Sequence, residues 1–129
     1  YPNAAIASDG GVITPGRGHP HPRSYGTNAR VLADYVRERG VLTLEDAIRR
    51  MTSLPARTFG FQDRGIVRPG FVADLVLFDP ERVVDKATFT DPHNYSEGFD
   101  TVIVNGVSVV SDGQLTDRRP GAFIAYNEK

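Results

Sequence analysis

The carboxylate of Asp9, the imidazoles of His19 and His21 and the guanidinium of Arg23 lie close together in the sequence, and these side chains have the clearest potential for chemistry. Asp9 follows a short apolar lead-in and precedes two glycines. This pattern is typical of a buried strand that ends where the backbone turns away. Chemistry in α/β proteins collects at such strand ends, and a carboxylate there can act as a general base. Alternatively, Asp9 closes a turn by bonding its own backbone beside Gly10. The local pattern leaves both roles open.

His19 and His21 flank Pro20 in a His-x-His arrangement that could hold a metal ion. An extended backbone at Pro20 would place both rings on the same side of the chain. A protein metal centre needs further ligands, however, and the remaining histidine, His93, lies in a distant part of the sequence. We therefore interpret His19 and His21 as loop residues.

Arg23 ends this polar stretch and has two possible roles. Its guanidinium could bind the carboxylate of a substrate through two parallel hydrogen bonds. It could equally pair with a nearby acidic side chain and fix the conformation of the loop. The residues alone do not decide between substrate binding and a structural ion pair.

Composition limits the partners that the chain can have. Hydrophobic residues make up 40% and charged residues 24%, which is typical of a soluble globular protein. The net charge is −1, and arginines alternate with acidic residues. The sequence therefore has no basic cluster of the kind that binds nucleic acid or an anionic membrane surface. No apolar run could span a bilayer, and the absence of cysteine excludes disulfides and thiolate ligands. The default expectation is a cytoplasmic protein.

Three helices are predicted before residue 60. The first begins at Thr27 or Asn28, whose side chains can cap free backbone N–H groups, and it ends at Gly40. The second begins with a capping box formed by Thr43 and Asp46. A short third helix is predicted over 56–59, with Pro55 before it and Gly60 after it. The second helix has an apolar stripe made of Leu44, Ala47, Ile48 and Met51.

Strands are predicted after about residue 61, where we place a boundary between two parts of the chain. Residues 72–79 have the pattern of a strand buried on most sides, and 80–100 show no period and form a long loop. Asn105-Gly106 is the strongest hairpin signal in the sequence. The predicted hairpin pairs Val104 with Val107 and Val102 with Val109, and a last strand is predicted over 122–126.

Asp74 lies inside the apolar run of the first predicted strand. A carboxylate in apolar surroundings must be paired or hydrogen-bonded, because leaving it alone costs free energy. We therefore predict a structural role for Asp74. The few strands that follow residue 61 have one apolar face and need a partner layer to cover it.

The order and spacing of several short motifs resemble those of the N-acyl-D-amino-acid deacylases, which belong to the metal-dependent amidohydrolase superfamily. The resemblance covers nearly the whole chain, and only the C-terminal part of such an enzyme. The chain begins at Tyr1 rather than Met, so either an upstream segment was removed or the chain is a piece of a longer protein, and the resemblance implies the second. The motifs are Ser8-Asp9-Gly10, His21-Pro22-Arg23, Tyr25-Gly26-Thr27, Ala73-Asp74-Leu75-Val76 and Val104-Asn105-Gly106.

The resemblance implies an α+β fold in two parts. Residues 1–60 would form the end of a (β/α)₈ catalytic barrel, with its last strand, an active-site loop and helices. Residues 61–129 would supply the C-terminal strands of a small β-sandwich. The other strands of that sandwich come from the N-terminal end of the same enzyme in this family.

The resemblance also implies a reaction and a site. The parent enzyme would hydrolyse the amide of an N-acyl-D-amino acid to a carboxylate and a free D-amino acid, with zinc as cofactor. In this family the Asp of the Ser-Asp-Gly motif lies beside the metal centre and accepts a proton from the attacking water. Asp9 would have this catalytic position near the metal, while Arg23 and His21 would contact the substrate.

The other metal ligands of the family lie upstream of the Ser-Asp-Gly motif, and this chain lacks them. We therefore expect the isolated chain to bind no catalytic zinc and to be inactive. Its expected partners are copies of itself or the missing N-terminal part of the enzyme, with the N-acyl amino acid as ligand of the parent. The alternatives are a non-catalytic assembly or binding module, or a fragment of a dihydropyrimidinase-like or cytosine-deaminase-like amidohydrolase.

Overall fold

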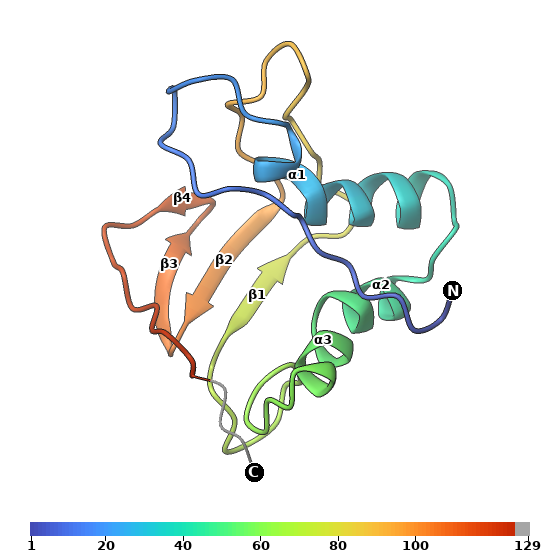
Figure 1. Cartoon of the computed structure of the whole chain (residues 1–129), viewed down its shortest axis with the longest axis vertical. Helices are drawn as coiled ribbons and strands as arrows, with labels where there is room; N and C mark the ends of the chain where they lie inside the picture. Colours follow the sequence, from blue (N-terminus) through green and yellow to red (C-terminus); the bar gives the residue numbers. More distant parts are fainter. Residues whose placement is uncertain (126–129) are drawn as a thin grey trace.

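A computed structural model describes residues 1–125, in which helices pack beside one antiparallel sheet (Figure 1). The sheet has four strands in the order β1-β2-β3-β4, so each strand neighbours the next one along the chain. The predicted α+β class is therefore confirmed. The elements are α1 (Arg23–Arg30), η1 (Val31–Glu38), α2 (Leu44–Met51), α3 (Ser53–Thr58), β1 (Leu75–Phe78), β2 (Phe99–Val104), β3 (Val107–Ser111) and β4 (Gln114–Leu115).

The first helix begins at Arg23, so the predicted N-cap at Thr27 or Asn28 is wrong. Pro22 precedes the helix and has helical backbone angles. Proline lacks a backbone N–H, but the N–H groups at the start of a helix have no carbonyl acceptor within the helix, so no hydrogen bond is lost. Thr27 lies inside the helix, where its hydroxyl donates to the carbonyl of Arg23 at 3.0 Å. The helix continues through η1, a π-helical stretch, and Gly40 with φ of 58° follows its end as predicted.

The second helix begins as the sequence predicts, because the Thr43 hydroxyl accepts a hydrogen bond from the Asp46 N–H at 3.2 Å. Its apolar stripe faces the first helix, and Ala47 is completely buried there. The third helix is also confirmed, although it begins at Ser53, before Pro55. The core of buried side chains consists of Ala29, Leu32, Ala47 and Val83.

Val83 comes from the long loop predicted over 80–100, which ends earlier because β2 begins at Phe99; we call the remainder the 80–98 segment. Apart from one bridge between Val84 and Glu97, this segment has no strand pairing and no helix. Arg37 donates to the carbonyl of Val83 at 2.9 Å, and Arg30 pairs with Asp85 at 2.8 Å. The segment therefore packs on the first helix, above which it rises in yellow and orange in Figure 1.

The first strand is shorter and less covered than predicted. β1 starts at Leu75, and its consecutive residues Val76 and Leu77 are 50% and 55% exposed. Consecutive strand residues point to opposite faces of a sheet, so neither face of β1 is buried. The prediction of a strand buried on most sides is therefore wrong, because Phe78 packs against the buried core whereas Val76 and Leu77 are half exposed.

The hairpin at Asn105-Gly106 is confirmed, and Val104 pairs with Val107 as predicted. Val102 pairs with Val110 rather than Val109, because the register shifts between Val102 and Ile103. Such a bulge adds one residue to one strand and cannot be seen in the hydrophobic pattern. Residues 122–125 form no strand, Tyr126 lies outside the described residues, and the two-residue strand β4 was not predicted.

Asp74 has the predicted structural role. One carboxylate oxygen accepts from the Asn105 N–H at 2.8 Å, and the other binds Arg64 at 2.8 Å. Asp74 thus joins the residues before β1 to the hairpin turn between β2 and β3.

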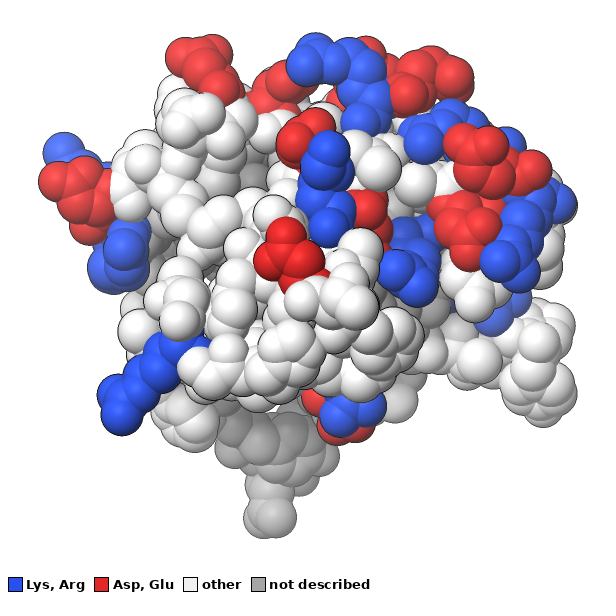
Figure 2. All heavy atoms as spheres, turned by 90° about the horizontal axis from the view of Figure 1, so that it is seen from above, with Lys and Arg blue, Asp and Glu red and all other residues white. Residues whose placement is uncertain are grey.

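Charges of both signs are interspersed over the face seen in Figure 2, with no large area of one sign. Among residues 1–125, no helix has the length and hydrophobicity required to cross a bilayer.

Candidate functional site

The segment before Asp9 is not the predicted strand. Residues 3–14 have no regular secondary structure, and Ile6 makes a single backbone bond, from its N–H to the carbonyl of Arg50 at 3.1 Å. A strand requires a ladder of such bonds with a neighbour. No described segment runs alongside residues 4–7, so the apolar lead-in remains extended without becoming a strand.

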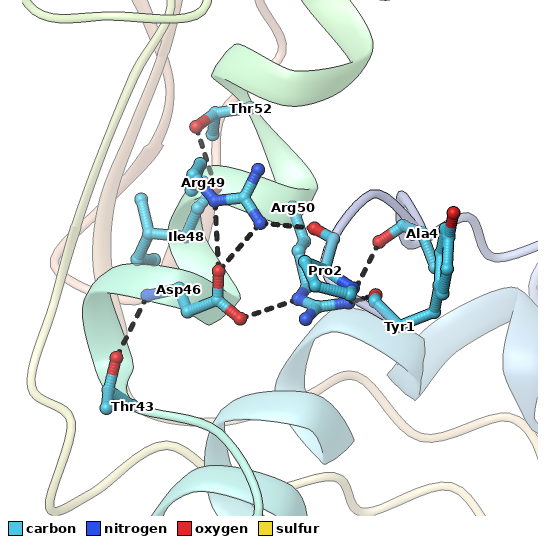
Figure 3. A network of polar contacts seen from close by, with 9 residues as sticks. All are labelled: Tyr1, Pro2, Ala4, Thr43, Asp46, Ile48, Arg49, Arg50 and Thr52. Atoms are coloured by element: carbon cyan, nitrogen blue, oxygen red, sulfur yellow. Dashed lines mark hydrogen bonds and ion pairs between the residues drawn. The ribbon is translucent and has the colours of Figure 1, made fainter.

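Arginines of α2 hold this N-terminal segment in place (Figure 3). The Asp46 carboxylate binds Arg50 at 2.7 Å and Arg49 at 2.8 Å, and these hydrogen bonds lower the pKa of Asp46. Both guanidinium groups then donate to backbone carbonyls of the lead-in. The distances are 2.6 Å from Arg49 to Pro2, 2.6 Å from Arg50 to Tyr1 and 3.2 Å from Arg50 to Ala4.

Asp9 itself lies on an exposed turn. Its φ is 49°, in the left-handed region that Asp tolerates better than most residues. The Gly10 N–H bonds to the Ser8 hydroxyl at 3.2 Å, so Ser8 rather than Asp9 makes the hydrogen bond of this turn. The Asp9 side chain is 83% exposed. Its carboxylate is therefore accessible to other groups.

Arg23 lies against Asp9, with 3.0 Å between Nη2 and Oδ2. The structure thus brings together two residues that were predicted separately for catalysis and substrate binding. The pair joins one nitrogen to one oxygen, and the Arg23 side chain is 46% exposed. Exposed ion pairs of this kind contribute only about 0–1 kcal/mol to stability, so another charged group can displace either partner from the pair.

His21 lies next to this pair, but its ring is occupied within the chain. Its Nδ1 accepts from the Arg23 N–H at 3.1 Å, and the ring packs edge-on against Phe89 with centroids 4.9 Å apart. His19 donates from Nε2 to the Phe89 carbonyl at 2.7 Å. Both histidines thus fasten the loop to the 80–98 segment, in agreement with their interpretation as loop residues.

His93 was set aside as distant in the sequence, and Tyr25 was named only within a resemblance motif, yet the two side chains contact each other beside the loop. The Tyr25 hydroxyl donates to His93 Nδ1 at 2.9 Å. Burial, and then the nearby Tyr95, raise the pKa of Tyr25, which keeps its proton available for this bond. His93 stands in an aperiodic segment, so no local signal in the sequence could have placed it here.

A complete metal centre is not formed by these residues. Among residues 1–125, no three His, Cys, Asp or Glu side chains are arranged to hold a metal ion. Asp9 contributes one accessible carboxylate, whereas zinc in proteins takes three or four protein ligands. The described residues therefore do not form a complete metal site, to which Asp9 could contribute one ligand.

Comparisons with known proteins give a consistent result. The family model described as "Amidohydrolase family" matches residues 4–110. N-acyl-D-aspartate deacylase of Alcaligenes xylosoxydans xylosoxydans is 45% identical over 125 residues, which are 97% of this chain and 24% of that protein. Its sequence is thus similar along almost all of this chain.

Solved structures are similar as well. A crystal structure of D-aminoacylase superposes with a TM-score of 0.81 and 46% identity, covering 88% of this chain and 23% of that one. N-acyl-D-glutamate deacylase from Bordetella bronchiseptica, in complex with zinc and a phosphonate inhibitor, gives 0.78 and 46%, covering 89% and 24%. The chain spans about a quarter of the length of the relatives that it matches.

Proposed function

We propose that this chain, which belongs to the amidohydrolase family, is the C-terminal portion of a metal-dependent hydrolase that cleaves N-acyl-D-amino acids. The observation that carries the proposal is the adjacency of Asp9 and Arg23, 3.0 Å apart on an exposed turn. In an N-acyl amino acid, the amide nitrogen and the carboxylate are attached to the same carbon. A base for the amide and a cation for the carboxylate must therefore lie side by side, as these two residues do.

Asp9 would act as the general base. Its carboxylate would accept a proton from the water that attacks the amide, and would hold that proton for the leaving nitrogen. A zinc ion bound in the complete protein would supply the acidity, because it lowers the pKa of bound water to about 7. The zinc in the Bordetella relative supports a metal in the parent enzyme.

Arg23 would bind the α-carboxylate of the substrate, with His21 beside it. In this structure Arg23 binds the base instead, so the two proposed roles require the ion pair to loosen. Because the Asp9–Arg23 ion pair is exposed, breaking it requires little free energy. A substrate carboxylate could then take both guanidinium N–H groups in the planar, bidentate geometry that arginine favours.

In the proposed parent, residues 1–60 end the catalytic barrel and residues 61–129 contribute strands to a small β-sandwich. Two features support this division. The N-terminal lead-in has no strand neighbour among the described residues, and β1 pairs only with β2, which leaves its other edge open. Both places suit strands from the remaining three quarters of the parent.

Assays of the complete parent with N-acyl-D-amino acids test the proposed function. Release of the free D-amino acid, with little turnover of the L enantiomers, is expected. Activity on dihydropyrimidines or cytosine instead would identify one of the alternative amidohydrolase activities. Absence of hydrolysis by the zinc-loaded parent on all these substrates would favour the assembly module.

The isolated 129-residue chain is expected to bind no stoichiometric zinc, because Asp9 lacks the further ligands of a closed site. Metal analysis after dialysis against zinc-free buffer should find far less than one zinc per chain. Retention of about one zinc per chain, lost on Asp9→Ala or His21→Ala substitution, would contradict this expectation.

The isolated chain is also expected to self-associate through its sheet. Burying apolar surface contributes about 25 cal/mol per Å². Light scattering over a concentration series should show dimers or larger species, reduced by Leu77→Lys and unchanged by Val41→Lys, an exposed apolar position away from the sheet. A monomer at high concentration with a cooperative melt would contradict the expectation. The exposed sheet residues are Val76, Leu77, Val107 and Leu115, at 50%, 55%, 38% and 62%.

A further inference from the structure

The loop between Asp9 and Arg23 has little structure of its own. Residues 10–21 contain no helix or strand, and one backbone bond within them, from the Arg17 N–H to the Thr14 carbonyl at 3.1 Å, closes a turn. Gly16 and Gly18 both have positive φ, which only glycine adopts without strain. A loop of this kind samples many conformations unless outside contacts fix it.

His93 supplies such contacts on both sides of its ring. Nδ1 accepts a hydrogen bond from the Gly16 N–H at 3.2 Å and a second one from the Tyr25 hydroxyl at 2.9 Å. Nε2 donates to the Gly18 carbonyl at 2.9 Å. The partners assign a neutral ring with its proton on Nε2, because a proton on Nδ1 would face the Gly16 N–H. One side chain thus binds the loop at two points and helix α1 at a third.

The backbone that carries His93 is itself well supported. The Ser96 hydroxyl donates to the Tyr25 carbonyl at 3.3 Å, and Tyr95 packs edge-on against Tyr25 at 5.5 Å. The bridge between Val84 and Glu97 closes the base of the segment. His93 therefore reaches the loop from a fixed position.

We propose that His93 is a positioning residue, which sets the loop between Asp9 and Arg23 and thereby the placement of the two side chains relative to each other. The catalytic consequence rests on the function proposed above, whereas the structural consequence does not. His93 makes no hydrogen bond to Asp9 or Arg23 within residues 1–125; its partners are Gly16, Gly18 and Tyr25. It acts through Gly16 and Gly18 on the loop side and through Tyr25 on the helix side.

Three substitutions separate the functions of the ring. His93→Asn keeps an acceptor at the place of Nδ1, His93→Gln keeps a donor at the place of Nε2, and His93→Phe keeps only the ring. His19→Phe is the matched control, because it removes one bond between the same loop and the same segment. Cleavage by trypsin after Arg17, followed by mass spectrometry on this chain, reports how often the loop opens.

Cleavage after Arg17 should become faster by roughly tenfold or more in His93→Phe, with partial rescue in His93→Asn and a smaller effect in His19→Phe. The ¹⁵N spectrum of the unmodified chain should show one His93 tautomer, protonated at Nε2. Unchanged cleavage in His93→Phe, or a ring that exchanges between both tautomers, would overturn the proposal.

In the complete parent, His93→Phe should raise KM and lower kcat/KM, and His93→Asn should recover part of both. A parent with the expected loop protection but no deacylase activity would refute the proposed function and leave the positioning role intact. A parent whose kinetics are untouched by His93→Phe while the loop opens would overturn the catalytic consequence.

Discussion

Replacing Asp9 by Asn in the complete parent should lower kcat by about 10²–10⁴-fold, the usual contribution of a general base. The amide has nearly the size of the carboxylate but cannot accept the proton of the attacking water. Substrate affinity should change far less, because proton transfer matters chiefly in the transition state. Asp9→Asn also removes the charge that holds Arg23, which leaves the guanidinium free for the substrate carboxylate.

Asp112→Asn is a close control for this experiment. Asp112 has φ of 50°, next to 49° for Asp9, and both residues precede a glycine. Any cost of placing Asn in this backbone conformation is therefore shared by the two variants. Turnover in Asp9→Asn within a few-fold of the unmodified parent, as in Asp112→Asn, would show that Asp9 is only a turn residue.

Replacing Gly98 by Ala should strongly destabilise the chain. Gly98 has φ of 89°, and an added Cβ would lie 2.5 Å from the backbone N and Cα of Val83. Since these are backbone atoms, no side-chain rotation relieves the clash, and Val83 belongs to the buried core. The free energy of unfolding should fall by at least about 2 kcal/mol. The melting temperature should fall by on the order of 10 °C.

Gly70→Ala separates the clash from the backbone conformation. Gly70 has φ of 85°, and no atom lies within 4 Å of its added Cβ, so this variant carries only the cost of a positive φ. That cost is roughly 1–2 kcal/mol for a residue with a side chain. Equal melting temperatures for Gly98→Ala and Gly70→Ala would show that the close approach to Val83 contributes nothing.

The features that sequence predicts correctly here are decided by neighbours in the chain. Thr43 caps α2 through a group three residues away, and Asn105-Gly106 closes its hairpin because both residues accept a positive φ. The features that were missed depend on distant contacts. The first helix extends back to Arg23, where Tyr25 and Gly26 pack against the 80–98 segment.

The candidate site shows the same division. Residue types and resemblance singled out Asp9 and Arg23, and their roles stay predictions. Their adjacency depends on a loop whose course no hydrophobic pattern encodes. His93 was set aside as distant, because its approach to Gly16 and Gly18 is fixed only by the folded 80–98 segment.

The 80–98 segment has a consequence for how such a chain can be recombined. Its two ends continue into strands β1 and β2, yet Val83 fills the core between the helices and Asp85 binds Arg30. A crossover between two relatives at residue 61 would give a chimera whose helices meet a foreign 80–98 segment. Compatible hybrids must therefore inherit this segment together with the helices, even though it lies on the other side of the crossover.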